Sequence, residues 1–246
     1  MDIYGLIGYP LGHSFSISYF NEKFQNENIN ARYVNFEIPN IEDLREILDS
    51  NPDLKGLNVT IPYKQKVIPY LDEVSPEARA IGAVNVIRIT RKGKNVWLKG
   101  FNSDVIGFTQ SIEPLLEKCH KKALILGTGG ASKAIDYGLR SLGLETVFVS
   151  RYQRPGTVQY ENITADDIQE YNVIVNCTPL GMYPKVDTCP NLPYEAMGRN
   201  TLLYDLIYNP DETLFMKRGL QRGATVKNGL EMLLLQAFAS WEFWHS

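Results

Sequence analysis

Four short segments carry hydroxyl, amide, ammonium and carboxylate groups directly after stretches of sequence that are typical of strands. They are residues 8–16, 58–64, 82–85 and 100–104. In α/β proteins, ligands usually bind at the carboxyl ends of the strands, where such side chains meet. Hydroxyls and amides can both donate and accept hydrogen bonds, so the set suits a small polyhydroxylated carboxylic acid.

Lys64 and Asp104 supply an ammonium group and a carboxylate to this set. A lysine next to a carboxylate and near a developing alkoxide can donate a proton or stabilise the charge. Each also has an ordinary structural interpretation, Lys64 as a solvated lysine and Asp104 as the cap of a helix that begins at Val105. Three other polar residues could equally cap a helix or tie loop backbone together: Ser14, Asn58 and Asn85. Considered singly, each residue favours the structural interpretation.

A strand, a glycine turn and the start of a helix occupy residues 122–134, which read KALILGTGGASKA. Gly127 and Gly129 would permit a tight turn and the close approach of a pyrophosphate, which the N–H groups of the following helix would face. The third glycine of the usual fingerprint is displaced, and Ala134 is small enough for the helix to pack on the strand. Such a turn is often only a turn, but its place in a βαβ series favours a dinucleotide site.

The end of the next strand distinguishes NAD from NADP. An NAD site usually carries an acid there for the ribose 2′-hydroxyl, whereas an NADP site needs a cation for the 2′-phosphate. Residues 149–154 read VSRYQR, with Arg151 and Arg154 and no acid. Two guanidinium groups can share one phosphate through charge-assisted hydrogen bonds. The pattern favours NADP over the alternative of two solvated surface arginines.

Alternating strands and helices must position these segments, and the chain has that rhythm. In the first half we expect strands at 3–9, 33–38 and 57–61, helices at 14–24, 41–48, 64–71 and 76–80, and a hairpin of 84–90 and 95–99 joined through Lys92, Gly93 and Lys94. In the second half we expect strands at 123–126, 146–150, 173–176 and 202–206, with helices at 105–116, 131–142 and 230–244.

This alternation predicts βαβ units and a parallel sheet in the second half. The last helix is hard to place there, because the preceding strands already complete a sheet, so we expect it to return to the first domain. The fold class is therefore two-domain α/β. Residues 1–103 with 230–246 would form a substrate domain, and residues 104–229 a Rossmann-like NADP-binding domain.

The composition is typical of a globular protein, with 44% hydrophobic and 22% charged residues. A net charge of -3 predicts neither a nucleic-acid partner nor a polybasic membrane signal, and no apolar run is long enough for a membrane span. The N-terminus has no secretory pattern, and the three cysteines form no paired framework, so a cytoplasmic location is expected. The scattered histidines and cysteines predict no metal site. We expect a small-molecule partner, and the sequence indicates no oligomeric state.

Seven motifs occur in order along the chain: GYPLGHSFS (8–16), NVTIPYK (58–64), GAVN (82–85), GFNSD (100–104), GTGGASKA (127–134), NCTPLGM (176–182) and MLLLQA (232–237). In these residues and spacings the chain resembles the shikimate dehydrogenase family over almost its full length. The resemblance implies an NADP-dependent oxidoreductase of aromatic amino acid biosynthesis that interconverts 3-dehydroshikimate and shikimate. It also implies two α/β domains around a cleft, with the closing helix returning to the substrate domain.

The resemblance further implies roles for matching residues. Lys64 and Asp104 would be the catalytic dyad, while Ser14 and Ser16 would hold the substrate carboxylate. The substrate hydroxyls would be bound by Thr60, Asn85, Tyr208 and Gln236. The cofactor would be bound by the glycine turn, by the end of the next strand and by two residues beside the nicotinamide: Gly127, Gly129, Gly130, Ala131, Ser150, Arg151, Arg154, Leu206 and Gly229.

The chain departs from the family pattern at four positions. Ser103 and Val86 stand where threonine is usual or frequent, Tyr152 replaces threonine between the arginines, and Glu231 stands where glycine is common. We expect Glu231 to face outward on its helix. Alternatives remain open: a quinate/shikimate dehydrogenase that uses NAD, or a non-catalytic ligand-binding homologue. A Rossmann methyltransferase would explain the glycine turn but would leave the dyad and the arginines without a role.

Overall fold

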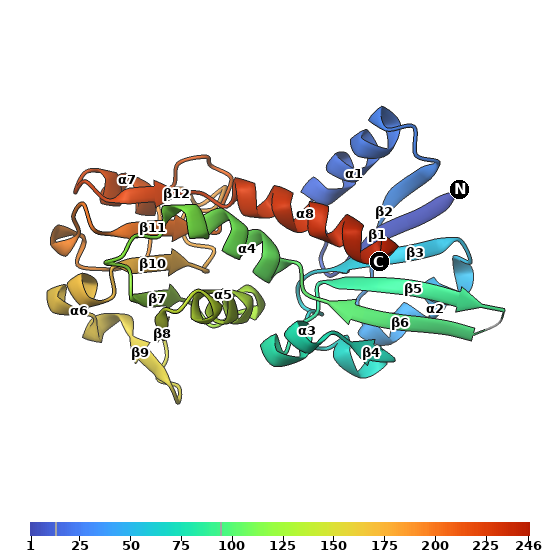
Figure 1. The fold of residues 1–246 in the computed structure, drawn as a ribbon, viewed down its shortest axis with the longest axis horizontal. Coiled ribbons are helices and arrows are strands. Elements are labelled where there is room, and N and C mark those ends of the chain that lie inside the picture. Colours follow the sequence, from blue (N-terminus) through green and yellow to red (C-terminus); the bar gives the residue numbers. More distant parts are fainter. Residues whose placement is uncertain (13, 94) are drawn as a thin grey trace. The chain divides into compact units, whose positions relative to one another are not determined.

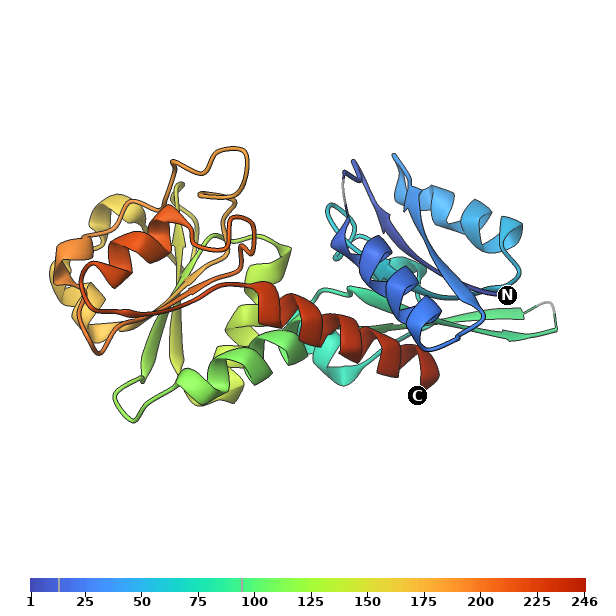
Figure 2. The ribbon, with the colours of Figure 1, turned by 90° about the horizontal axis from the view of Figure 1, so that it is seen from above.

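The computed structural model describes residues 1–12, 14–93 and 95–246. His13 of the first motif and Lys94 of the expected hairpin turn lie outside the described residues. The chain divides into two compact units, Met1–Ser103 with Ala237–Ser246, and Asp104–Gln236. Each unit contains one six-stranded sheet covered by helices (Figures 1 and 2). The expected α/β fold class is confirmed.

The first unit has the strand order β2-β1-β3-β5-β6-β4. Strands β1, β2 and β3 are parallel, and β5 and β6 form the expected antiparallel hairpin. The strands are β1 (Asp2–Gly8), β2 (Ala31–Glu37), β3 (Leu54–Val59), β4 (Glu73–Val74), β5 (Val86–Lys92) and β6 (Asn95–Phe101). The helices are α1 (Phe15–Asn26), η1 (Ile41–Asp43), α2 (Leu44–Ser50), η2 (Ile68–Tyr70) and α3 (Pro76–Ile81).

Apolar side chains cover both faces of this sheet, which is why β1 reads as a continuous hydrophobic run. On one face, Ile7 and Leu57 pack with Leu44 of α2. On the other, Phe20 of α1 packs against Trp244, with ring centroids 5.1 Å apart. A Cβ on Gly56 would lie 2.3 Å from the Trp244 ring, so glycine is required there. The last residues of α8 (Leu230–His245) therefore contribute to this core.

The outer edge of β2 is closed at one point by a side chain of α1. The Asn21 Nδ2 donates to the Tyr33 carbonyl oxygen over 2.9 Å, and the Tyr33 N–H donates to the Asn21 Oδ1 over 2.9 Å. A neighbouring strand would make the same two bonds to one residue. Asn21 thus satisfies both backbone groups of Tyr33 at the sheet edge.

The second unit has an all-parallel sheet in the order β12-β11-β10-β7-β8-β9. Helices α4 and α5 pack on one face with the start of α8, while α6 and α7 pack on the other. The strands are β7 (Lys122–Leu126), β8 (Glu145–Ser150), β9 (Thr157–Gln159), β10 (Val173–Asn176), β11 (Leu202–Asp205) and β12 (Thr225–Lys227). The helices are α4 (Asp104–Ile112), η3 (Glu113–Leu115), α5 (Gly130–Ser141), η4 (Tyr160–Asn162), α6 (Ala165–Glu170), η5 (Tyr194–Ala196) and α7 (Leu214–Leu220).

The expected helix over residues 64–71 is wrong: the segment consists of turns and the short η2. In an α-helix the Lys64 carbonyl would accept from Ile68, but here it accepts from the Val84 N–H over 2.7 Å. Pro69 has no N–H with which to extend the turn. The expected helix over 105–116 likewise ends at Ile112, with Pro114 in the following η3.

Candidate active site

Lys64 lies in the loop that follows β3, and hydrogen bonds hold the residues that precede it in that loop. The Thr60 N–H donates to the Ile7 carbonyl over 2.9 Å, and the buried Tyr63 hydroxyl donates to the Ile38 carbonyl. The bond from Val84 holds the backbone of Lys64 itself. The half-buried Lys64 and the half-buried Thr60 therefore leave the sheet from a rigid loop at the carboxyl end of β3.

Asn85 is buried and uses its amide to hold the last residue of the first unit. Its Oδ1 accepts from the Ser103 N–H over 2.6 Å, and its Nδ2 donates to the Ser103 hydroxyl over 3.0 Å. Ser103 stands where the family has threonine, and the hydroxyl that both share makes this contact. Asp104, the next residue, begins α4. Asn85 therefore ties loop backbone together, and its role toward the substrate stays a prediction.

Ser14 and Ser16 lie at the start of α1. Ser14 occupies the N-cap position, yet its side chain makes no capping hydrogen bond to the described first turn. The structural alternative, in which the Ser14 side chain caps the helix, is therefore not supported. The Ser16 side chain bonds to the hydroxyl of Tyr33, whose pKa burial raises. The Tyr33 hydroxyl in turn donates to the Asn58 Oδ1 over 2.9 Å, so Asn58 ties neighbouring elements together.

Asp104 begins α4 and is 4% exposed. One turn later, Gly107 touches α8: a Cβ there would lie 2.5 Å from the Met232 oxygen and 2.9 Å from the Gln236 nitrogen. Only glycine permits this approach of two helices. It brings the backbone of Gln236 against α4, one turn along the helix from Asp104. Figure 1 shows α4 beside the start of α8. Tyr208 lies in the loop after β11 and is 40% exposed.

The glycine turn lies between β7 and α5 in the conformation that its residues predict. Gly127 has a φ of 102°, which favours glycine, and a Cβ there would lie 3.0 Å from Thr178. Gly129 is the N-cap of α5, and an added Cβ would meet nothing within 4 Å among the described residues. Gly130 and Ala131 begin the 12-residue helix α5, so the turn leads directly into a helix N-terminus. The space beside Gly129 is open. These features fit a bound pyrophosphate.

The expected cations lie at the end of β8. The Arg154 guanidinium donates to the Thr128 hydroxyl over 3.1 Å, which connects it to the glycine turn. The Arg151 guanidinium lies 5.7 Å from the centre of the Tyr152 ring, at cation–π distance. Ser150 is buried, and its hydroxyl accepts from the Tyr152 N–H over 3.2 Å. Both arginines are exposed, so a phosphate can reach them.

Leu206 follows β11 and Gly229 follows β12, the neighbouring parallel strand, and the two residues meet. A Cβ on Gly229 would lie 2.1 Å from the Leu206 carbonyl oxygen, and the Gly229 N–H donates to the Ile207 carbonyl over 3.0 Å. Glu231 is exposed and pairs with Lys227 over 2.5 Å, which confirms that it faces outward. Sequence reasoning missed the contacts of Thr128 and Gly107, because neither residue type signals its partner.

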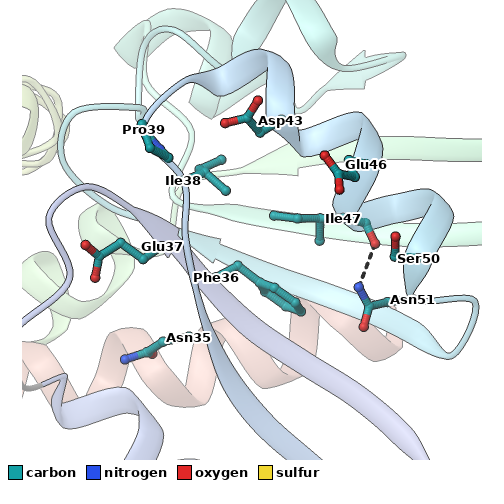
Figure 3. Close-up of a pocket in the computed structure, with 10 residues that line it drawn as sticks. All are labelled: Asn35, Phe36, Glu37, Ile38, Pro39, Asp43, Glu46, Ile47, Ser50 and Asn51. Atoms are coloured by element: carbon teal, nitrogen blue, oxygen red, sulfur yellow. Dashed lines mark hydrogen bonds between the residues drawn. The ribbon is translucent and has the colours of Figure 1, made fainter.

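A shallow pocket of about 450 Å³ lies beside β2 and α2 in the first unit (Figure 3). Three of its side chains are acidic, and none is cationic, so it would repel a substrate carboxylate. None of the expected substrate residues lines it. Its lining residues are Asn35, Phe36, Glu37, Ile38, Pro39, Asp43, Glu46, Ile47, Ser50 and Asn51.

Comparison with known proteins decides the family. The model of the shikimate dehydrogenase substrate binding domain matches residues 6–87. A shikimate dehydrogenase (NADP(+)) of Carboxydothermus hydrogenoformans is 38% identical over 98% of this chain and 90% of the relative. The chain belongs to the shikimate dehydrogenase family. The seven motifs are therefore family motifs, as the resemblance implied.

Two solved structures of the family add ligands to the comparison. Shikimate 5-dehydrogenase of Thermus thermophilus, in complex with NADP(H) and shikimate, has a TM-score of 0.85 at 29% identity, covering 99% of this chain and 92% of that chain. The Listeria monocytogenes enzyme, in complex with shikimate and NAD, has a TM-score of 0.85 at 26% identity, covering 99% and 91%. Relatives of this fold are thus known with either cofactor. The residues at the end of β8 are therefore the ones that distinguish NADP from NAD.

Among the described residues, no group of histidine, cysteine, aspartate and glutamate side chains could hold a metal ion. Within the same residues, no helix is long and apolar enough to cross a membrane.

Proposed function

We propose that this chain catalyses the NADP-dependent interconversion of 3-dehydroshikimate and shikimate in aromatic amino acid biosynthesis. The observation that supports the cofactor assignment is the Arg154–Thr128 hydrogen bond, because it joins a cation to the glycine turn. An acid at the end of β8 would favour NAD, but the residues there are Ser150, Arg151 and Tyr152. The cofactor, when bound, supplies hydride transfer at its nicotinamide.

The substrate would be held mainly through hydroxyl and amide groups. Ser14, whose side chain is not used to cap α1, and Ser16 would bind the carboxylate. The hydroxyls would be bound by Thr60, Asn85, Tyr208 and Gln236. Such groups donate or accept as the ligand requires, which suits a polyol.

Lys64 and Asp104 would act as the acid–base pair at the oxygen on the carbon that loses or gains hydride. Lys64 would donate a proton to the developing alkoxide during reduction and remove it during oxidation. Asp104 would keep the ammonium group in place. Support comes from the rigid backbone at Lys64 and from the burial of Asp104.

We propose residues 1–103 with 230–246 as the substrate domain and residues 104–229 as the NADP-binding domain. The compact units differ from this division only by assigning residues 230–236 to the second. We also propose a cytoplasmic location, where free thiols such as those of Cys119, Cys177 and Cys189 stay reduced.

Steady-state assays with shikimate and quinate, each with NADP⁺ and NAD⁺, test the proposal. We expect the highest kcat/KM with shikimate and NADP⁺. Equal or higher values with NAD⁺ would refute the cofactor assignment, and preference for quinate would support the broader quinate/shikimate alternative. Shikimate binding without turnover would indicate a non-catalytic homologue.

A further inference from the structure

A completely buried carboxylate lies at the carboxyl end of β11, outside the set of residues considered so far. Asp205 is 0% exposed. Its Oδ1 accepts from the Asn176 Nδ2 over 3.0 Å and from the Ile207 N–H over 3.1 Å, while its Oδ2 accepts from the Thr213 hydroxyl over 2.7 Å. All three bonds are donated to the carboxylate, as an ionised acid requires.

Asn176 extends this network along the loop after β10. Its Nδ2 also donates to the Leu180 carbonyl over 3.3 Å. Its Oδ1 accepts from the N–H and from the hydroxyl of Thr178, over 3.0 and 2.7 Å. The Leu180 N–H then donates to the Thr178 hydroxyl. Both ends of the segment from Thr178 to Leu180 are thus held from a single side chain at the end of β10.

Ile207 extends the network in the other direction. The Asp205 carboxylate holds the Ile207 N–H, and the Ile207 carbonyl accepts from Gly229, whose Cα packs against Leu206. Thr213 closes this loop, because its hydroxyl caps α7 by accepting from Met216. Asp205 therefore fixes the loop after β11 at both ends.

We propose that Asp205 is a positioning residue that holds Leu206, Gly229 and the loop after β10 in the arrangement that binds the nicotinamide half of the cofactor. The proposal rests on the proposed function. Asp205 has no exposed surface and so acts on the cofactor only through the two loops. The adenine half would be bound elsewhere, at the glycine turn and the end of β8.

The charge of Asp205 argues against a merely structural role. Burial raises the pKa of Asp205 to about 6, although the three donors partly offset this effect. At neutral pH the fold therefore carries a buried anion that weakens it, and a neutral side chain would avoid that penalty. Side chains with pKa values shifted in this way are enriched at functional sites.

Two variants test the role of Asp205, each with a ligand pair as readout. Asp205→Asn keeps the shape but replaces one acceptor with a donor, and Thr213→Val removes one bond from the carboxylate. Calorimetry would measure the Kd of NADP⁺ and of adenosine 2′,5′-bisphosphate, which lacks the nicotinamide half. We expect NADP⁺ to bind about tenfold more weakly, the effect of one lost hydrogen bond, with the fragment unchanged within about twofold.

Thr201→Val is the matched control. Thr201 is also buried, precedes β11 and accepts a backbone N–H, that of Gly198, over 3.1 Å. It has no contact with Asp205 among the hydrogen bonds of the described residues, so the ratio of the two Kd values should stay at the wild-type value. Steady-state assays should show kcat reduced in Asp205→Asn and Thr213→Val but not in the control.

Equal weakening of NADP⁺ and the fragment would overturn the proposal in favour of a general structural role, as would no change in either. If Asp205→Asn does not fold, Thr213→Val carries the same test. A wild-type protein that binds NADP⁺ without oxidising shikimate would refute the proposed function, while the affinity ratio would still decide the role of Asp205.

Discussion

The Arg154 guanidinium donates a hydrogen bond to the Thr128 hydroxyl, which joins the end of β8 to the turn between β7 and α5. Thr128 lies between the two glycines of that turn, so a phosphate bound by Arg154 would lie near the place where a pyrophosphate fits. Arg151 is held separately, against the Tyr152 ring. The two cations are thus positioned by different partners before any ligand binds.

Replacing either arginine should change cofactor preference rather than folding. We expect Arg151→Gln and Arg154→Gln each to raise the KM for NADP⁺ by about tenfold or more, because each removes a charge-assisted bond to the 2′-phosphate. The KM for NAD⁺ should stay nearly constant. Arg140→Gln, which removes an exposed arginine paired with Asp136 on α5, is the control. An equal effect of all three variants would refute the phosphate site.

Loss of the Lys64 ammonium should abolish most turnover. Lys64→Met keeps the length of the side chain and the backbone bond to Val84, so we expect the fold and NADP⁺ affinity to persist. The kcat should fall about 10²–10⁴-fold, as for other general acid–base groups. Lys66→Met, at an exposed position two residues away, should have wild-type kcat. A similar kcat in both variants would contradict the dyad.

Ser14 and Thr164 both occupy helix N-caps but should respond in opposite ways. Ser14 makes no capping bond, so Ser14→Ala should leave the free energy of unfolding unchanged and raise the KM for shikimate about tenfold through a lost bond to the carboxylate. Thr164 forms a capping box with Asp167, so Thr164→Ala should cost about 1 kcal/mol without changing KM. Urea unfolding measures the free energy of unfolding of each variant, and shikimate titrations measure its KM. A loss of stability in Ser14→Ala would contradict the prediction.

Gly129 provides a test of the pyrophosphate site. Its backbone φ of -77° suits alanine, and the added methyl would meet no described atom within 4 Å. Gly129→Ala should therefore fold normally while occupying space needed by the phosphates, and the Kd of NADP⁺ should rise about tenfold or more. Gly198→Ala, at a glycine with equally open space, is the control. Unchanged NADP⁺ affinity in Gly129→Ala would place the phosphates elsewhere.

Ionisation of Asp205 should make stability depend on pH. Burial raises its folded-state pKa from the usual 3.8 to about 6, so the unfolded chain loses the proton first as pH rises. Relative to Asp205→Asn, wild-type stability should be greatest below pH 4 and fall by about 3 kcal/mol by pH 7. The neighbouring Cys177 and Tyr194 stay neutral in this window, because burial raises both pKa values. If the free energies of unfolding of wild type and Asp205→Asn, measured with urea, changed in parallel from pH 4 to 7, Asp205 would not be the titrating group.

The sequence predicted those parts of the site that depend on local residue types. The glycine turn, the arginines after β8 and the segments that carry Asn85 and Ser103 all follow from short patterns, and the structure has them where expected. The prediction of a helix over residues 64–71 was wrong because apolar spacing carries no information on the competing bond from Val84, which is 20 residues away. Only the folded sheet brings that donor to Lys64.

Other elements carried signals that sequence reasoning did not use. Thr164 and Asp167 are spaced as a capping box, which would have predicted α6. The Asp205 network had no such signal. Its partner Asn176 ends β10, whereas Thr213 lies in the loop after β11, far along the chain. An aspartate at a strand end is also common on a solvated surface. Burial distinguishes the Asp205 network from a solvated aspartate, and the sequence alone does not give the burial of Asp205.

The two hydrogen bonds between Asn21 and Tyr33 also affect how the edge of β2 can meet other molecules. An open strand edge invites a strand of another molecule to extend the sheet, which is a common start of aggregation. At Tyr33 the amide of Asn21 already takes the place that such a strand would need. This one side chain thereby makes the edge of β2 at Tyr33 unavailable to a strand of another molecule.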